Sequence, residues 1–243
     1  MKMYGWRGKI GHIAPSRGDI FVYEFYRMAP RGVLLFNTTG TIRQLDRADI
    51  ERQITRIEEA AFDLAAEGVD LILIGGTPLF TSQGVGSDIR TAQRIEEKVK
   101  VRVSAGVTGE LEALKTLGLK RIVVASPHED EVNERLKAFL EGNGFKVIHI
   151  RGLGIRKNSE ISKVPEYGSY QLAKKVFFEA SERPDGVFLP CPRWPTIVNL
   201  DLLEKELGCP VISSCQAYTW WGLKLLNIRE NISGFGKLMG TLA

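Results

Sequence analysis

The sequence has no long hydrophobic run and few cysteines. No apolar stretch reaches the ~18–20 residues that a membrane-spanning helix needs, and the first residues contain no apolar core of a secretory signal. The three cysteines form no C-x-x-C pair, and their odd number argues against a disulfide framework. We therefore expect a protein that works without a membrane, in the reducing environment of the cytoplasm.

The motifs of common cofactor, nucleotide and hydrolase chemistries are also missing. The chain has no G-x-G-x-x-G after its first apolar run, no Walker loop, no G-x-S-x-G and no H-E-x-x-H. Its three histidines show no metal-ligand spacing. The net charge of +4 is small and the basic residues are scattered, which disfavours nucleic acid and favours a small anionic ligand. We expect neither cofactor nor metal, and we leave open whether the chain forms a homo-oligomer.

What the sequence does contain is an alternation of short apolar runs with longer amphipathic stretches. Eight runs have the length of strands: 9–14, 33–36, 70–74, 101–104, 121–125, 146–150, 186–189 and 210–213. Four stretches have helical periodicity: 49–67, 110–117, 130–143 and 167–182. This alternation predicts an α/β fold with a mostly parallel sheet, in which ligands bind beyond the carboxyl ends of the strands.

Three pairs of segments suggest an internal repeat. The sequence at 10–16 resembles that at 122–128, 70–78 resembles 185–192, and 103–119 resembles 212–228, at offsets of 109 to 115 residues. The alternative is that parallel strands simply resemble one another. A true repeat predicts two similar α/β halves, 1–115 and 116–243, with the last helix free to pack on the first half. Their strand-end loops would then face each other across a cleft.

The paired strand ends hold the first candidate site residues. Cys191 follows the run at 186–189 and is flanked by prolines, where its thiol could donate a proton or, once ionised, act as a nucleophile. The alternative is a small buried apolar side chain. The matching loop in the first half carries Gly76, which allows close approach of a ligand, and Thr77, whose hydroxyl can bind a carboxylate, although an ordinary βα turn explains them equally well.

Other residues near the same strand ends are candidate ligand contacts. His128 follows a matched strand and could donate a hydrogen bond to an anion; Ser16 and Arg17 hold the corresponding place in the first half. Arg17 and Arg193 are the cations nearest the predicted cleft, and either could bind a carboxylate. Each of these residues could equally be a solvated loop residue or part of the core.

Several stretches spread over nearly the whole chain resemble one enzyme superfamily. They are IGHIAP at 10–15, Gly76-Thr77 with Gly84, DEVNERLKAF at 130–139, GLGI at 152–155 and PVISS at 210–214, of which DEVNERL is the most specific. With these stretches the chain resembles the aspartate/glutamate racemase superfamily, and within it arylmalonate decarboxylase and the maleate cis–trans isomerases. The resemblance implies two pseudosymmetric, doubly wound parallel-sheet halves, a site in the cleft between them, and no cofactor.

The resemblance also implies roles for individual residues. Racemases and isomerases of the superfamily generally carry one cysteine in each half, whereas here Gly76 takes the first position and only Cys191 remains, as in arylmalonate decarboxylase. Carried across, Cys191 is the proton donor, Thr77 is an oxyanion partner, and His128 stands where the decarboxylase has an oxyanion-binding tyrosine. Two departures are Pro78 and Pro192, which have no N–H and so remove two backbone donors of that enzyme.

We therefore expect a cofactor-free carboxy-lyase that decarboxylates a malonate-type diacid. The reaction would pass through an enediolate that the single cysteine, Cys191, protonates on one face. Two alternatives stay open: a maleate-like cis–trans isomerase in which the same cysteine adds to a C=C bond, and a non-catalytic carboxylate-binding protein. A racemase is disfavoured because only one half supplies a thiol.

Overall fold

The computed structural model describes residues 4–14, 19–40 and 47–243. It contains two separate four-stranded parallel sheets. The first sheet has the strand order β2-β1-β3-β4 and comprises β1 (Gly8–Ala14), β2 (Val33–Thr39), β3 (Leu71–Ile74) and β4 (Arg102–Ala105). The second has the order β6-β5-β7-β8 and comprises β5 (Arg121–Ser126), β6 (Lys146–Gly152), β7 (Gly186–Leu189) and β8 (Val211–Ser213). The same strand order recurs in both sheets, so the α/β fold in two similar halves is confirmed.

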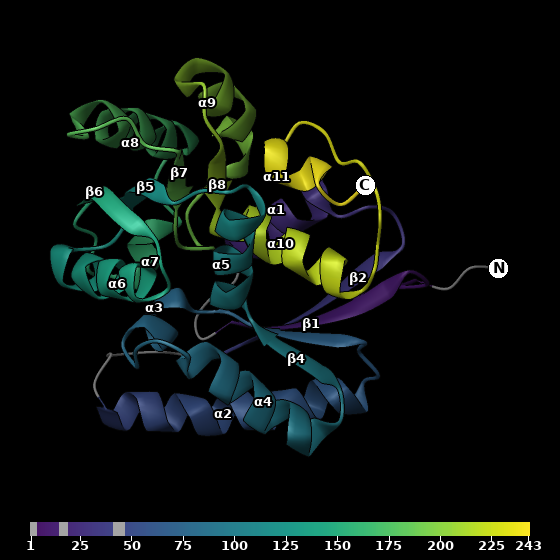
Figure 1. Cartoon of the computed structure of the whole chain (residues 1–243). Coiled ribbons are helices and arrows are strands. Elements are labelled where there is room, and N and C mark those ends of the chain that lie inside the picture. The colour runs from purple at the N-terminus through teal and green to yellow at the C-terminus, as the bar shows by residue number, and fades with distance from the viewer. Residues whose placement is uncertain (1–3, 15–18, 41–46) are drawn as a thin grey trace.

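Helices cover the sheets and fill the space between them (Figure 1). The helices of the first half are α1 (Asp19–Met28), α2 (Arg47–Ala66), α3 (Thr77–Thr81), α4 (Ser87–Val99) and α5 (Gly106–Thr116). The later ones are α6 (Asp130–Gly142), α7 (Asn158–Ile161), α8 (Glu166–Glu179), the 3-10 helix η1 (Ile197–Asn199), α9 (Leu200–Leu207), α10 (Ser214–Leu225) and α11 (Lys237–Gly240).

The central strands form because they are continuous apolar runs. Every residue of β3 and β7 is buried, as expected for strands covered on both faces. On one side of the first sheet, α2 packs its buried stripe of Ile57, Ala61 and Leu64 against β1 and β3. In the second half, α8 packs against β5, β6 and β7.

The helices α5 and α10 form a pair at the centre of the molecule (Figure 1). Each begins where a strand ends: Gly106 follows β4 directly and Ser214 follows β8 directly. The side chain of Ser213 caps α10 by accepting the Gln216 N–H. Since α10 also contacts α1 and β3, a helix from the end of the chain packs on the first half. The boundary at 115/116 between the halves stays a prediction.

Candidate active site

The loops after β3 and β7 share an unusual backbone conformation. Gly76 has a φ of 96° and Cys191 a φ of 89°, so both lie in the region that favours glycine. The internal repeat in the sequence aligns these two positions with each other. A cysteine in this conformation is strained, and such strain is commonly kept where a side chain has a function.

A chain of buried hydrogen bonds joins these two loops. Thr77, the first residue of α3, donates its hydroxyl to Glu110 Oε1 of α5 at 3.0 Å. Ser214 at the start of α10 donates to the same oxygen and accepts the backbone N–H of Cys191 at 2.8 Å. Glu110 therefore connects the threonine of the first loop with the cysteine of the second.

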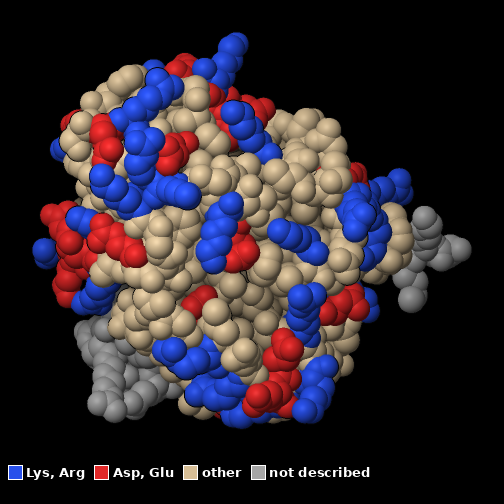
Figure 2. All heavy atoms as spheres, in the orientation of Figure 1, with Lys and Arg blue, Asp and Glu red and all other residues tan. Residues whose placement is uncertain are grey.

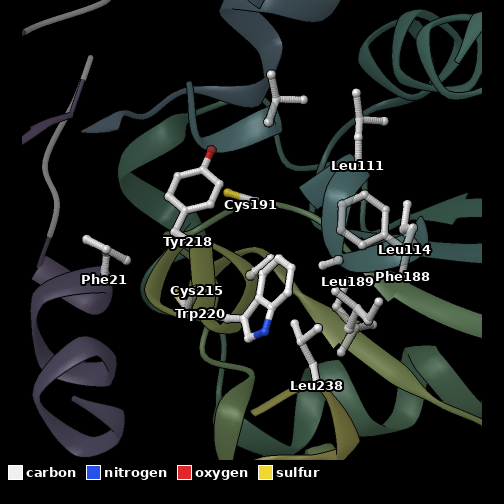
Figure 3. Packing of buried hydrophobic residues seen from close by; sticks show 14 of the residues in the cluster. Phe21, Leu111, Leu114, Phe188, Leu189, Cys191, Cys215, Tyr218, Trp220 and Leu238 are labelled. Carbon is white, nitrogen blue, oxygen red and sulfur yellow. The ribbon is translucent and has the colours of Figure 1, made fainter. Parts of the chain in front are cut away.

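Tyr218 of α10 completes this cluster. Its hydroxyl lies 3.3 Å from Thr77 Oγ1, and its ring packs against Phe21 of α1. Figure 3 shows Tyr218 and Cys191 within the same group of buried side chains, with Cys215 beside them. We call Thr77, Glu110, Cys191, Ser214 and Tyr218 the loop-bridging cluster; all five are buried.

Burial sets the protonation of this cluster. It raises the pKa of the Cys191 thiol to about 12, although the backbone N–H of Arg193 and its guanidinium oppose the shift. Burial also raises the pKa of Glu110 to about 7, against the hydrogen bonds from Ser214 and Thr77. Near neutral pH Cys191 is therefore a thiol, and Glu110 stands close to the midpoint of its titration.

The two prolines of the loops do not leave the cysteine without backbone donors. The Trp194 N–H, two residues beyond Pro192, donates to the Cys191 carbonyl at 3.2 Å, and the backbone N–H groups of Arg193 and Trp194 act to lower the pKa of the Cys191 thiol. Pro78 lies in the first turn of α3, where a missing N–H costs no helical hydrogen bond. The expected loss of two donors thus holds for the prolines themselves, but the backbone of later residues in the second loop favours the ionised form of the sulfur.

His128 lies in the turn after β5. The turn is held by hydrogen bonds from the His128 N–H to Ser126 Oγ and from Asn133 Nδ2 to the His128 carbonyl. Burial lowers the pKa of the ring to about 4, so the ring is neutral near pH 7. Within the described residues its Nε2 has no hydrogen-bond partner, which leaves this buried atom available to a ligand.

The remaining candidates differ in how the structure places them. Arg193 is buried, and its positive charge acts on the Cys191 sulfur. Ser16 and Arg17 fall within 15–18, outside the described residues. Trp220 is fully buried and donates to Thr241 Oγ1 at 2.9 Å, so it belongs to the core.

Sequence reasoning missed the helical members of the cluster. The sequence predicts Glu110 only as the first residue of a helix, whereas it is the fifth residue of α5. The one available signal was a carboxylate shortly after a predicted strand. Ser214 lies in the PVISS stretch that carries the family resemblance, but the sequence gave it no role, and Tyr218 gave no signal. A fourth residue, Glu24 of α1, is also buried; it accepts the N–H of Thr196 at 2.7 Å and so ties α1 to the segment after Cys191.

A cavity of about 280 Å³ lies at the carboxyl ends of β1 and β2. Thr38, Thr39 and Gly40 line it together with residues of α2. Cys191, Thr77 and His128 are not among the described residues that line this cavity.

Within residues 4–14, 19–40 and 47–243, no helix is both long and apolar enough to cross a membrane. The same ranges contain no group of three or more His, Cys, Asp or Glu side chains placed to hold a metal ion. On the face shown in Figure 2, Lys and Arg lie among Asp and Glu rather than in one basic patch.

Comparison with known proteins gives consistent matches. The family model "Arylmalonate decarboxylase" matches residues 11–239. Arylmalonate decarboxylase of Bordetella bronchiseptica is 28% identical over 216 residues, covering 89% of each chain. Maleate isomerase of Nocardia farcinica is 25% identical over 189 residues, covering 75% of this chain and 74% of the relative.

Solved structures of both enzymes share the fold. Unliganded arylmalonate decarboxylase superposes with a TM-score of 0.84 at 25% identity, covering 96% of this chain and 98% of the other. A mutant of the Nocardia farcinica maleate cis–trans isomerase with a covalently bound succinylcysteine intermediate superposes with a TM-score of 0.87 at 19% identity, covering 96% and 98%. The second likeness concerns the fold alone.

The fold and these relatives define the class: the protein has the two-half α/β architecture of the aspartate/glutamate racemase superfamily. Within that class, the chain belongs to the arylmalonate decarboxylase family. Its relatives are enzymes, both decarboxylases and isomerases, and a decarboxylase or isomerase function follows at that level.

Proposed function

We propose that the protein is a cofactor-free carboxy-lyase acting on a malonate-type dicarboxylic acid, with Cys191 as the acid that protonates the product. The observation that carries this proposal is the asymmetry of the paired loops. Gly76 and Cys191 have matching backbone conformations, but only Cys191 has a side chain that can move a proton. One acid on one face suits a decarboxylation, whereas a racemase needs an acid on each face.

The protonation state of Cys191 supports the same role. Because burial raises the pKa of the thiol to about 12, the group keeps its proton near neutral pH and can give it to a stronger base. A carbanion or enediolate left by loss of CO₂ is such a base. Thiolate chemistry would instead require the ionised form, which burial disfavours.

In the proposed reaction the bond between the α-carbon and one carboxylate breaks, CO₂ leaves, and the electron pair remains as an enediolate on the other carboxylate. The α-carbon then takes the proton from Cys191 Sγ, and solvent restores that proton. Thr77, Arg193 and the neutral ring of His128 would hold the carboxylate and the developing enediolate. Gly76 leaves room for close approach of the substrate, and Ser16 and Arg17 stay candidates for carboxylate binding.

A second candidate function has one observation in its favour. The backbone N–H groups of Arg193 and Trp194 act to lower the pKa of the Cys191 thiol and would stabilise a thiolate that adds to the double bond of a maleate-like diacid. The succinylcysteine intermediate described for the Nocardia farcinica isomerase is an adduct of that kind. We place this isomerase second because burial outweighs the two donors in setting the pKa of Cys191.

Incubation of the protein with substituted malonates and maleate, followed by NMR, tests the proposal. We expect release of CO₂ and a monocarboxylic product from a malonate. An isomer of equal mass from maleate would favour the second function. Cys191→Ala should lower turnover by about a hundredfold or more, whereas Cys209→Ala, at a cysteine between α9 and β8, should leave it unchanged. Undiminished turnover by Cys191→Ala would refute the role of Cys191.

A further inference from the structure

Thr77 cannot donate one proton to two partners. A threonine hydroxyl carries one hydrogen and two acceptor lone pairs. In the structure Thr77 Oγ1 lies 3.0 Å from Glu110 Oε1, and an ionised Glu110 can only accept. With Glu110 ionised, the Thr77 proton is therefore committed to Glu110 and cannot reach the substrate.

The other oxygen of Glu110 points to a neutral form. Oε2 is buried and has no hydrogen-bond partner within the described residues, a costly situation for an ionised carboxylate. Oε1 receives both hydrogen bonds, from Thr77 and from Ser214. A carboxyl proton on Oε1 would change only one of these contacts, by reversing the direction of the bond to Thr77.

We propose that Glu110 is a positioning residue that acts in its protonated form, donating to Thr77 Oγ1 and so releasing the Thr77 hydroxyl proton for a carboxylate of the substrate. The inference rests on the proposed function for its substrate class. In this state Thr77 accepts from Glu110 and from Tyr218, which lies 3.3 Å away, and donates into the site. No proton leaves Glu110; only the direction of the hydrogen bond changes.

The groups around Glu110 favour the same state. The titratable side chains that face it are Tyr218 and Cys215 of α10 and Cys191 after β7, and burial keeps all three neutral near neutral pH. Two of the elements that pack against α5, namely α3 and β8, contain no titratable side chain. Arg102 of β4 instead donates to the Leu225 carbonyl. On α4, Asp88 accepts from Thr108.

Binding of an anion should therefore be coupled to proton uptake. Burial already brings the pKa of Glu110 to about 7, and a nearby carboxylate of the ligand raises it further. Above this pH the protein must take up about one proton per ligand, and the apparent dissociation constant should rise about tenfold per pH unit.

Titration calorimetry on the full chain tests this coupling with malonate, maleate and succinate. Measurements at pH 8 in two buffers of different ionisation enthalpy give the number of protons taken up. We expect about one proton for the wild-type protein and none for Glu110→Gln, whose amide donates to Thr77 at every pH. The matched control is Glu112→Gln on the same helix, a partly exposed residue paired with Lys115, which should behave as wild type.

The outcomes separate this inference from the proposed function. Binding without proton uptake, or equal uptake by Glu110→Gln, overturns the role of Glu110; in the second case His128 becomes the first alternative. Proton uptake without decarboxylation of any malonate overturns the proposed reaction and leaves the role of Glu110 intact. If no diacid binds, both fail. If Glu110→Gln does not fold, His128→Gln is the second variant: proton uptake that persists in it excludes His128 as the source, and uptake that is lost in it overturns the role of Glu110.

Discussion

At the scale of single residues, Cys191 combines a buried thiol with a backbone conformation that residues with a side chain rarely adopt. Its φ of 89° matches the 96° of Gly76 at the equivalent place in the first half. The loop of the first half has a glycine at this position, and the loop of the second half has a cysteine. A strained side chain at only one of two equivalent positions supports the proposed one-sided proton donor.

The strain at Cys191 predicts a difference in stability between two variants that lack the thiol. Cys191→Gly and Cys191→Ala both remove the thiol, but only glycine relieves the left-handed conformation. We expect the glycine variant to be the more stable by about 1 kcal/mol. Urea unfolding of both variants measures the difference, and equal stabilities would mean that the backbone at Cys191 is not strained.

The second residue-scale prediction concerns Glu110 and pH. Its pKa rises from 4.5 to about 7 on folding, so its contribution to stability is complete below pH 4.5 and is lost as the pH rises through 7, by about 3 kcal/mol. Glu110→Gln should remove this loss. The pKa values of His12 and His128 fall to about 4 on folding, so these two groups reduce stability as the pH drops from 6.5. This effect is the same in the wild-type protein and in Glu110→Gln, so it cancels when the two are compared.

Urea unfolding of both proteins at pH 5 and pH 8 provides the measurement. The stability of wild type relative to Glu110→Gln should fall between the two values of pH. A constant difference would show that Glu110 has an ordinary pKa in the folded protein.

At the scale of elements, the site depends on the close approach of α5 and α10. A Cβ added to Gly106 would lie 2.1 Å from Cζ of Tyr218, and one added to Gly109 would lie 2.8 Å from Cβ of Trp221. The glycines therefore let α10 approach closely enough for Tyr218 to reach Thr77. Both residues that carry the bridge between the loops, Glu110 and Ser214, belong to these two helices.

Gly106→Ala should disturb both packing and activity. We expect a loss of about 1–3 kcal/mol of stability from overpacking, together with a lower kcat/KM because Tyr218 is displaced from Thr77. Gly240→Ala is the control, since its Cβ would meet nothing nearer than 3.7 Å. Urea unfolding and turnover measure the two effects, and a Gly106→Ala protein as stable and active as the control would contradict this account of the helix pair.

The elements also show how far the sequence could predict the structure. All eight strands were predicted, because fully buried strands such as β3 and β7 are short continuous apolar runs. By contrast, α4 was missed because its buried side includes Ser87, Asp88 and Thr91, which interrupt the apolar stripe. The helix α10 is buried on nearly all sides, so it lacks the amphipathic period that marks a surface helix.

The same limit applies to the candidate site. Cys191 and Thr77 could be identified because they directly follow strands, and the carboxyl ends of parallel strands are where ligands bind. Glu110, Ser214 and Tyr218 come from helices. Their side chains meet only through packing between the two halves, which no local sequence pattern encodes.

At the scale of the whole molecule, buried contacts tie the two sheets together. Glu24 of α1 accepts N–H groups from Thr196 and Ile197 after β7, and Glu110 joins the two loops. The packing of α10 on α1 and β3 adds an apolar contact between the halves. The site therefore needs both halves in place.

We expect the two halves to unfold together. Trp194 lies in the second half, and Trp220 and Trp221 lie on α10 where it packs against the first half, so fluorescence reports on the second half and on this contact, whereas far-UV circular dichroism reports on the whole chain. Urea transitions followed by the two methods should coincide. Separate midpoints would mean that the contacts between the halves are weak.

The most direct test of one-sided chemistry is the stereochemistry of decarboxylation in D₂O. The substrate is a malonate with two different substituents on the α-carbon, and the product is analysed by NMR with a chiral shift reagent. A single thiol at Cys191 should deliver one deuteron to one face, giving one enantiomer with a single deuterium at the α-carbon. A racemic product formed by the wild-type protein, and equally by Cys191→Ala, would contradict the central claim.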